Sequence, residues 1–149
     1  MKQTLFNKIL LILDGMDTSM AAATLAIKMA AELKSSVLAL YVVDTPTLDY
    51  LLKEHVLLKE EHDTMELELE KSADRFLHYV AELARESGAT LSCRSCKGRL
   101  SQVGLQTARE IDADVIVMGN CRSSSRHDLS TTERHLLLTE CASPVIIVR

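Results

Sequence analysis

The sequence predicts a doubly wound α/β fold, in which helices cover both faces of a parallel five-stranded sheet. Five short apolar segments alternate with longer segments of helical periodicity along the 149 residues. Repeated strand–helix–strand units form parallel sheets with right-handed crossovers. The first two strand candidates contain the continuous apolar runs 9–13 and 37–43, as expected when helices cover both faces. The length suits one domain over residues 1–149, of the Rossmann-like or flavodoxin-like class.

Each element has its own local signal. Strands are expected at 7–13, 37–43, 90–96, 115–118 and 145–148, and helices at 20–33, 63–87, 100–111 and 131–140. Small residues in the first helix favour close packing on a sheet, and Gly88 suits the end of the second. Pro46 disfavours a helical Thr45, so a loop is expected to begin there. Residues 48–62 are expected to form a mobile or helical insertion that leads into the second helix, and the acidic stretch at 54–70 is expected to be a solvated helix face.

Charge and composition exclude several classes of function. The net charge is −4 and only five residues are aromatic, which argues against nucleic-acid binding. No apolar run approaches the roughly 20 residues of a membrane span, and no secretory signal is apparent. The expected setting is the cytoplasm, where cysteines stay reduced.

The residues that directly follow three of the predicted strands are polar or include glycine, and together they form the candidate ligand site. They are Asp14–Gly15, Val43–Asp44 and the segment after Gly119. Ligands of doubly wound folds bind beyond the carboxyl ends of the strands, where the strand order reverses. Such exits are also ordinary loops, because every strand must end.

The segment after Gly119 offers the richest chemistry. Arg122 and Arg126 could pair with phosphate, and the helix start near Thr131 and Thr132 adds the positive end of a helix dipole. The alternative is a solvated Ser/Arg-rich loop without a ligand.

The cysteines and histidines give weak signals for metal or redox chemistry. Cys93 and Cys96 are three apart in a predicted strand, so they point to opposite faces, and no second pair completes a zinc site. Cys121 is the better candidate for a reactive thiol. His55 and His62 would share a helix face but lie two turns apart, too far for one metal. His127 and His135 have no better case, so we expect neither a metal site nor a catalytic triad.

Four segments carry a pattern that extends over the whole chain. They are residues 8–15, 37–44, 98 with 112–119, and 141–148. Together they resemble the universal stress protein family, whose strands exit in Val-Asp-Gly-Ser and His-Val-x-Asp. The resemblance implies strand order 3-2-1-4-5 and a homodimer formed through the C-terminal strand. Such an apolar edge strand invites pairing with a partner.

The resemblance also implies an adenine-nucleotide site in which two of three glycines are missing. ATP-binding members carry Gly, two residues, Gly, nine residues, then Gly and Ser/Thr. Here Gly119 is present, Arg122 takes the second glycine position, and Thr131 or Thr132 takes the third. Asp14 corresponds to the family's acidic residue near the ribose and metal, and Val42 to the residue whose backbone contacts adenine.

The residues and the family resemblance together leave three hypotheses. The first is a cytoplasmic, dimeric stress-response binding module without enzyme activity, in which ATP or AMP is a possible ligand of a degraded site. The alternative is an ATP- or AMP-binding member with slow hydrolysis that uses Asp14 and a metal. A redox sensor using Cys121 or the Cys93–Cys96 pair is the third.

Overall fold

The five strands form one parallel sheet in the order β3-β2-β1-β4-β5, as the family resemblance predicted. The computed structural model describes residues 5–14, 18–120 and 129–149, with the backbone alone at 129–131. The strands are β1 (Lys8–Leu13), β2 (Ser36–Val43), β3 (Thr90–Lys97), β4 (Val115–Gly119) and β5 (Val145–Val148). The order reverses between β1 and β4, which places the switch point there.

The helices agree with prediction except in the segment after β2. They are α1 (Thr18–Leu33), α2 (Thr45–Lys53), α3 (Lys59–Ser87), α4 (Leu100–Ile111) and α5 (Leu129–Glu140). The expected loop at Thr45 was wrong, because α2 begins there. Asp44 caps this helix by accepting from the Thr47 N–H, and Pro46 lies in the first turn. In the first turn, the N–H that proline lacks would have no partner within the helix, and the fixed φ of proline is already helical.

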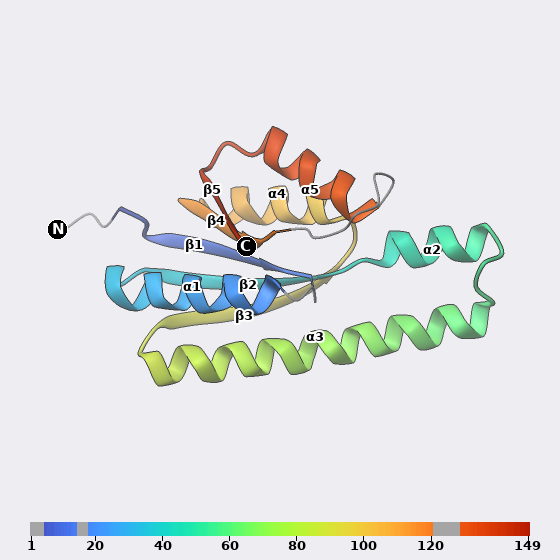
Figure 1. Ribbon diagram of the computed structural model, residues 1–149, viewed down its shortest axis with the longest axis horizontal. Coiled ribbons are helices and arrows are strands. Elements are labelled where there is room, and N and C mark those ends of the chain that lie inside the picture. The colour runs from blue at the N-terminus through green and yellow to red at the C-terminus, as the bar shows by residue number, and fades with distance from the viewer. Residues whose placement is uncertain (1–4, 15–17, 121–128) are drawn as a thin grey trace.

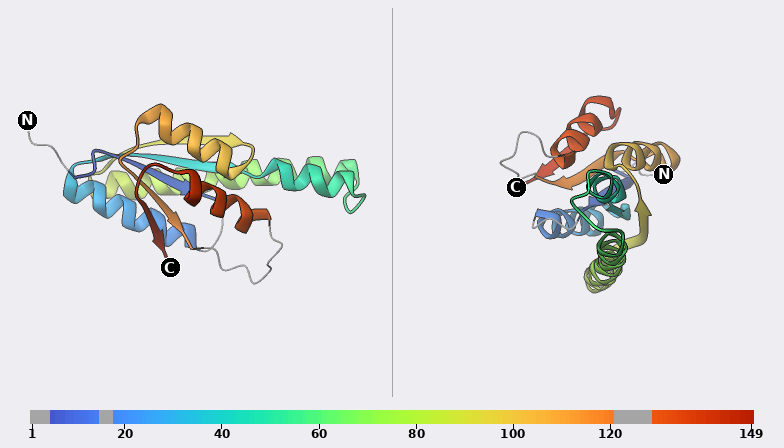
Figure 2. Two further views of the ribbon diagram at one scale, coloured as in Figure 1. Left: turned by 90° about the horizontal axis from the view of Figure 1, so that it is seen from above. Right: turned by 90° about the vertical axis from the view of Figure 1, so that its right-hand side faces the viewer.

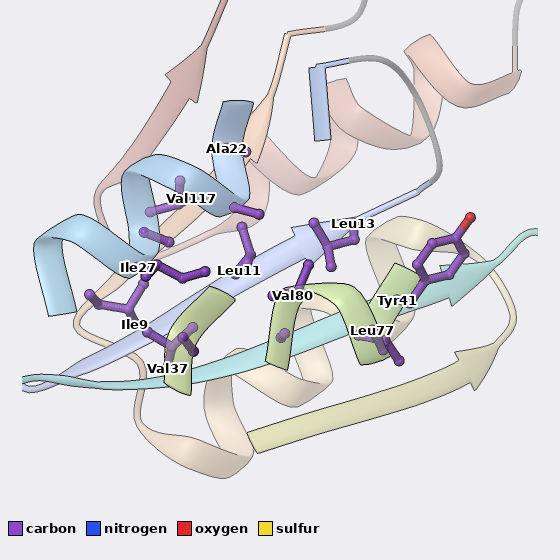
Figure 3. Packing of buried hydrophobic residues seen from close by; sticks show 14 of the residues in the cluster. Ile9, Leu11, Leu13, Ala22, Ile27, Val37, Tyr41, Leu77, Val80 and Val117 are labelled. Carbon is purple, nitrogen blue, oxygen red and sulfur yellow. The ribbon is translucent and has the colours of Figure 1, made fainter. Parts of the chain in front are cut away.

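Alternation along the strands divides the core into two layers. Side chains of Ile9, Leu11 and Leu13 pack with α1 and α3 on one face. Leu10 and Ile12 pack with α4 and α5 on the other. Figure 1 shows these two helix pairs on opposite sides of the sheet, and Figure 3 shows the layer under α1 and α3. Burial on both faces explains why β1 is apolar at successive positions.

The segment between β2 and β3 is longer than the sheet that it covers. In Figures 1 and 2, α2 and the first half of α3 extend beyond the carboxyl ends of the strands. The second half of α3 returns along the sheet and ends at Gly88, which adopts φ 73° as a left-handed cap. Within the part of the chain that the structure describes, no helix has the length and apolarity that crossing a membrane would require.

Candidate functional site

The switch point brings together Asp14 at the end of β1 and Gly119 at the end of β4. The Ser19 hydroxyl of α1 donates to Asp14 Oδ1 at 3.0 Å, and Thr18 Oγ1 donates to the Asn120 carbonyl at 2.7 Å. Hydrogen bonds therefore join the start of α1 to the residues that follow β1 and β4. This is the edge of the sheet where the fold class places ligands.

A buried arginine occupies this position. Arg134 of α5 is 6% exposed, and its guanidinium donates from Nη2 to Asp14 Oδ2 and from Nη1 to the Gly119 carbonyl. Its Nε has no hydrogen-bond partner among the described residues. Asp14 thus has one carboxylate oxygen engaged by Ser19 and the other by Arg134. A buried arginine charge needs such a partner, because desolvation of an unpaired ion is costly.

A cavity of about 180 Å³ lies beside this ion pair, between the ends of β1 and β2 and the starts of α4 and α5. It is bordered by Asp14, Tyr41, Val42, Val43, Asp44, Leu69, Leu100 and Glu133. Its volume is below the roughly 300–1,000 Å³ of typical ligand pockets. Among the described residues that line it, three are carboxylates and none is a lysine or arginine, so a polyphosphate placed there would lie close to carboxylate oxygens.

Each of these carboxylates is held by its own partners. Asp44 Oδ2 accepts from the Thr47 hydroxyl at 2.6 Å. Glu133 Oε1 accepts from Arg99 Nε at 2.8 Å, and Oε2 accepts from the Ser101 N–H at 3.0 Å. Glu133 therefore fills the anion-binding position at the start of α4 with a carboxylate from within the chain.

The titration of two lining side chains reflects this environment. Burial, reinforced by the negative charge of Asp14, raises the pKa of the Tyr41 phenol, so Tyr41 stays protonated. Burial alone would raise the pKa of Glu133, but the hydrogen bonds from Ser101 and Arg99 outweigh it and lower that pKa. Glu133 is therefore ionised at neutral pH, and its charge is paired with that of Arg99.

The structure brings together three of the predicted site residues. Asp14 and Val42 line the cavity, and Gly119 lies behind Arg134. Thr132 is exposed on α5, and only the backbone of Thr131 is described. Gly15, Arg122 and Arg126 lie outside the described residues, as do Cys121 and His127. The predicted pairing of Arg122 and Arg126 with phosphate and the predicted reactivity of Cys121 remain predictions.

Sequence analysis missed Arg134 and the role of Glu133. Arg134 and Leu137 are three residues apart and both are buried, so they share the inner face of α5. The available signal was that Arg134 falls on the apolar face of α5, where a buried cation requires a partner.

Cys93 and Cys96 lie on opposite faces of β3, as predicted. Cys93 Sγ contacts the Leu77 carbonyl of α3 at 3.7 Å, whereas Cys96 packs in the opposite layer. Cys93 is exposed as a residue, but partial burial of its thiol raises the pKa of that group, which disfavours the reactive thiolate. Cys93, Cys96 and Cys141 are free.

His55 and His62 do not lie on one helix, so the shared helix face considered from their spacing does not exist. His55 lies in the connection between α2 and α3, at φ 61°, and His62 lies within α3. In the described residues, His62, Asp63 and Glu66 bring potential metal-ligand atoms within 4.8 Å of one another. These groups already pair among themselves and with Lys97, so their proximity has an internal explanation.

The fold and the switch-point crevice define a doubly wound α/β protein of the kind that places a ligand between its first and fourth strands. The universal stress protein family model matches residues 5–149. A universal stress protein of Methanocaldococcus jannaschii is 30% identical over 156 residues, covering 99% of this chain and 84% of that protein. The chain belongs to the universal stress protein family.

Solved structures of the same family share the fold. A family member from Burkholderia pseudomallei has a TM-score of 0.76 at 21% identity, with 99% of this chain and 98% of that chain covered. A universal stress protein in complex with cAMP has a TM-score of 0.69 at 17% identity, with 99% and 98% covered. Both comparisons confirm the doubly wound architecture.

Proposed function

We propose that this protein is a cytoplasmic, dimeric stress-response binding module without enzyme activity, whose adenine-nucleotide site has lost its phosphate half. One observation carries the proposal: the guanidinium of Arg134 occupies the space between Asp14 and the Gly119 carbonyl. The guanidinium occupies the Asp14 carboxylate oxygen with which a bound metal or ribose would interact. The single domain over residues 1–149 is part of the same proposal.

The cavity beside Arg134 supports the loss of phosphate binding. A nucleoside triphosphate exceeds about 180 Å³, and its phosphates would approach Asp14 and Glu133. The adenine half is less altered, because Val42 still borders the cavity. One structural relative is described in complex with cAMP. Weak binding of ATP or AMP through the base is therefore compatible with the proposal, and tight binding through phosphates is not.

Slow hydrolysis with Asp14 and a metal is the less favoured alternative. Both carboxylate oxygens of Asp14 accept hydrogen bonds within the chain, from Ser19 and Arg134. A metal would have to displace Arg134 and leave a buried guanidinium unpaired, which costs several kcal/mol, on the order of 3–5. The position of β5 at the sheet edge supports the dimer, since an unpaired edge can pair with a second copy.

Calorimetry with ATP and magnesium, and separately with AMP, tests the proposal. Loss of several phosphate contacts moves binding from micromolar towards millimolar, because each 1.4 kcal/mol costs about tenfold in affinity. We therefore expect dissociation constants well above micromolar and no nucleotide mass released from the purified protein on denaturation. Low-micromolar ATP binding would contradict the proposal. Phosphate release that disappears in Asp14→Asn would favour the hydrolase instead.

A further inference from the structure

The part of the chain that extends beyond the sheet has little apolar cover. We define the arm as residues 45–71, which comprise α2, its connection and the first half of α3. The structure describes all of them, and only Leu48 and His62 are buried. Figures 1 and 2 show the arm projecting past the carboxyl ends of the strands. Most of its side chains therefore face solvent.

Large apolar side chains are concentrated on the exposed surface of this arm. Among the described residues, nine large hydrophobic side chains are exposed, and five of them belong to the arm: Tyr50, Val56, Leu58, Met65 and Leu67. Leu58 is 70% exposed and Val56 is 66% exposed. Scattered single apolar residues need no explanation, but five of the nine lie within 18 residues of this arm. Tyr50, Val56 and Leu58 lie at the end of α2 and in its connection to α3, whereas Met65 and Leu67 are two residues apart on α3 and therefore lie on different faces of that helix.

The charge of the arm indicates what could cover these side chains. Residues 45–71 contain eight acidic and three basic residues, so the arm carries −5, whereas the whole chain carries −4. The rest of the chain is close to neutral at +1. Two arms would repel each other, and so would an arm and an anionic lipid surface. The complementary occupant is apolar and basic.

The arm is also held in a defined shape. His62 of α3 contacts Asp49 of α2 through Nε2 at 2.8 Å. The Leu58 N–H donates to Glu61 at 3.1 Å, and Lys97 of β3 pairs with Glu66 at 3.5 Å. These contacts join α2 to α3 and α3 to the sheet. A surface ordered before binding loses less conformational entropy when a partner docks.

We propose that the arm is a docking surface for a basic amphipathic helix of another protein. The apolar face of such a helix would cover the exposed side chains around Tyr50 and Leu58. Its Lys and Arg side chains would pair with carboxylates of the arm such as Glu60 and Glu68, which are both exposed. Acidic rims around apolar contacts select basic helices and speed their association.

The experiment measures binding of a fluorescent synthetic helix of leucine and lysine, with leucines at helical spacing. A matched peptide replaces every lysine with glutamate. The full-length protein should bind the lysine peptide at micromolar concentration, with an affinity that falls as salt is added, and should not bind the glutamate peptide. Equal binding of the two peptides, or no binding of the lysine peptide, would overturn the proposal.

Matched substitutions locate the site. Tyr50 is 54% exposed on the arm and Tyr79 is 51% exposed outside it. Tyr50→Ser should weaken binding about tenfold, as expected for an aromatic contact, whereas Tyr79→Ser should not. Glu68→Lys should weaken binding, whereas Glu86→Lys, near the far end of α3, should not. Equal effects within either pair would refute the arm as the site.

Two other occupants have distinct signatures. If a second copy covered the arm, Tyr50→Ser would dissociate an oligomer seen by light scattering. If a lipid surface covered it, the protein would sediment with phosphatidylglycerol vesicles, and Tyr50→Ser would abolish this. Either result would overturn the proposal in favour of that occupant. Circular dichroism of each variant confirms that it is folded.

Discussion

Replacing Arg134 with methionine tests how much the Arg134–Asp14 ion pair at the switch point stabilises the protein. Methionine keeps an unbranched apolar stem and removes the guanidinium, so the packing changes little. The Asp14 side chain is 15% exposed in the wild-type protein, and in the variant it keeps its Ser19 hydrogen bond but loses its cation. Removing one partner of a buried pair costs about 3–5 kcal/mol. The retained hydrogen bond suggests the lower end, about 3 kcal/mol.

Urea unfolding followed by circular dichroism, at one fixed protein concentration, measures this loss. For a chain of this size, about 3 kcal/mol corresponds to a fall in melting temperature of roughly 6–12 °C. Arg109→Met is the control, because Arg109 is exposed and has no ion pair among the described residues. Its effect should stay within about 0.5 kcal/mol.

A double-mutant cycle separates the ion pair from the individual side chains. Asp14→Asn removes the carboxylate charge and leaves Arg134 unpaired. In the double variant neither residue is charged, so its loss should be smaller than the sum of the two single losses by about 1–3 kcal/mol. Additivity within about 0.5 kcal/mol would refute the reasoning. The crevice would then be organised without this ion pair.

Three further predictions concern the sheet edge, the arm and a cysteine. Ile147, 39% exposed on β5, should be needed for the proposed dimer, so Ile147→Lys should give a monomer by light scattering; an unchanged mass would contradict pairing through β5. Hydrogen bonds to Asp63 and Asp49 raise the pKa of the His62 imidazole. The stability that protonated His62 adds to the folded protein is therefore complete below its ordinary pKa of about 6.5 and is lost as pH rises through the raised value. The melting temperature should therefore fall over that range in wild type and less in His62→Asn; equal slopes would refute this. Because burial raises the pKa of the Cys93 thiol, iodoacetamide should label it slowly at neutral pH and quickly after unfolding, and mass spectrometry of its peptide measures both; fast labelling of the folded protein would show a reactive thiol.

The sequence predicted the sheet well because its strands carry a strong local signal. β1 is apolar at successive positions, and β2 and β4 are similarly buried on both faces. α2 was missed because Pro46 was interpreted as a helix breaker, although a proline in the first turn of a helix is favoured. Propensity alone does not distinguish these two situations. The Asp44 cap before it was the additional signal.

The candidate site was less predictable because its determining contact joins residues that are 120 apart in the sequence. Asp14 was identifiable from its position at a strand exit. Its partner Arg134 lies in a helix, where an arginine is ordinarily expected to face solvent. Local patterns indicate which face a residue shares, but not which buried carboxylate it meets.

Gly119 shows why one retained glycine is weak evidence for a nucleotide. A Cβ at this position would lie 2.4 Å from Thr18 Oγ1 and 2.7 Å from the Thr18 carbonyl carbon. The backbone of α1 therefore requires glycine here whether or not phosphate binds. The glycine positions taken by Arg122 and by Thr131 or Thr132 are the ones that the family resemblance ties to phosphate. Those glycines are absent and Arg134 contacts the Gly119 carbonyl. The presence of Gly119 is therefore explained by the packing of α1 on β4.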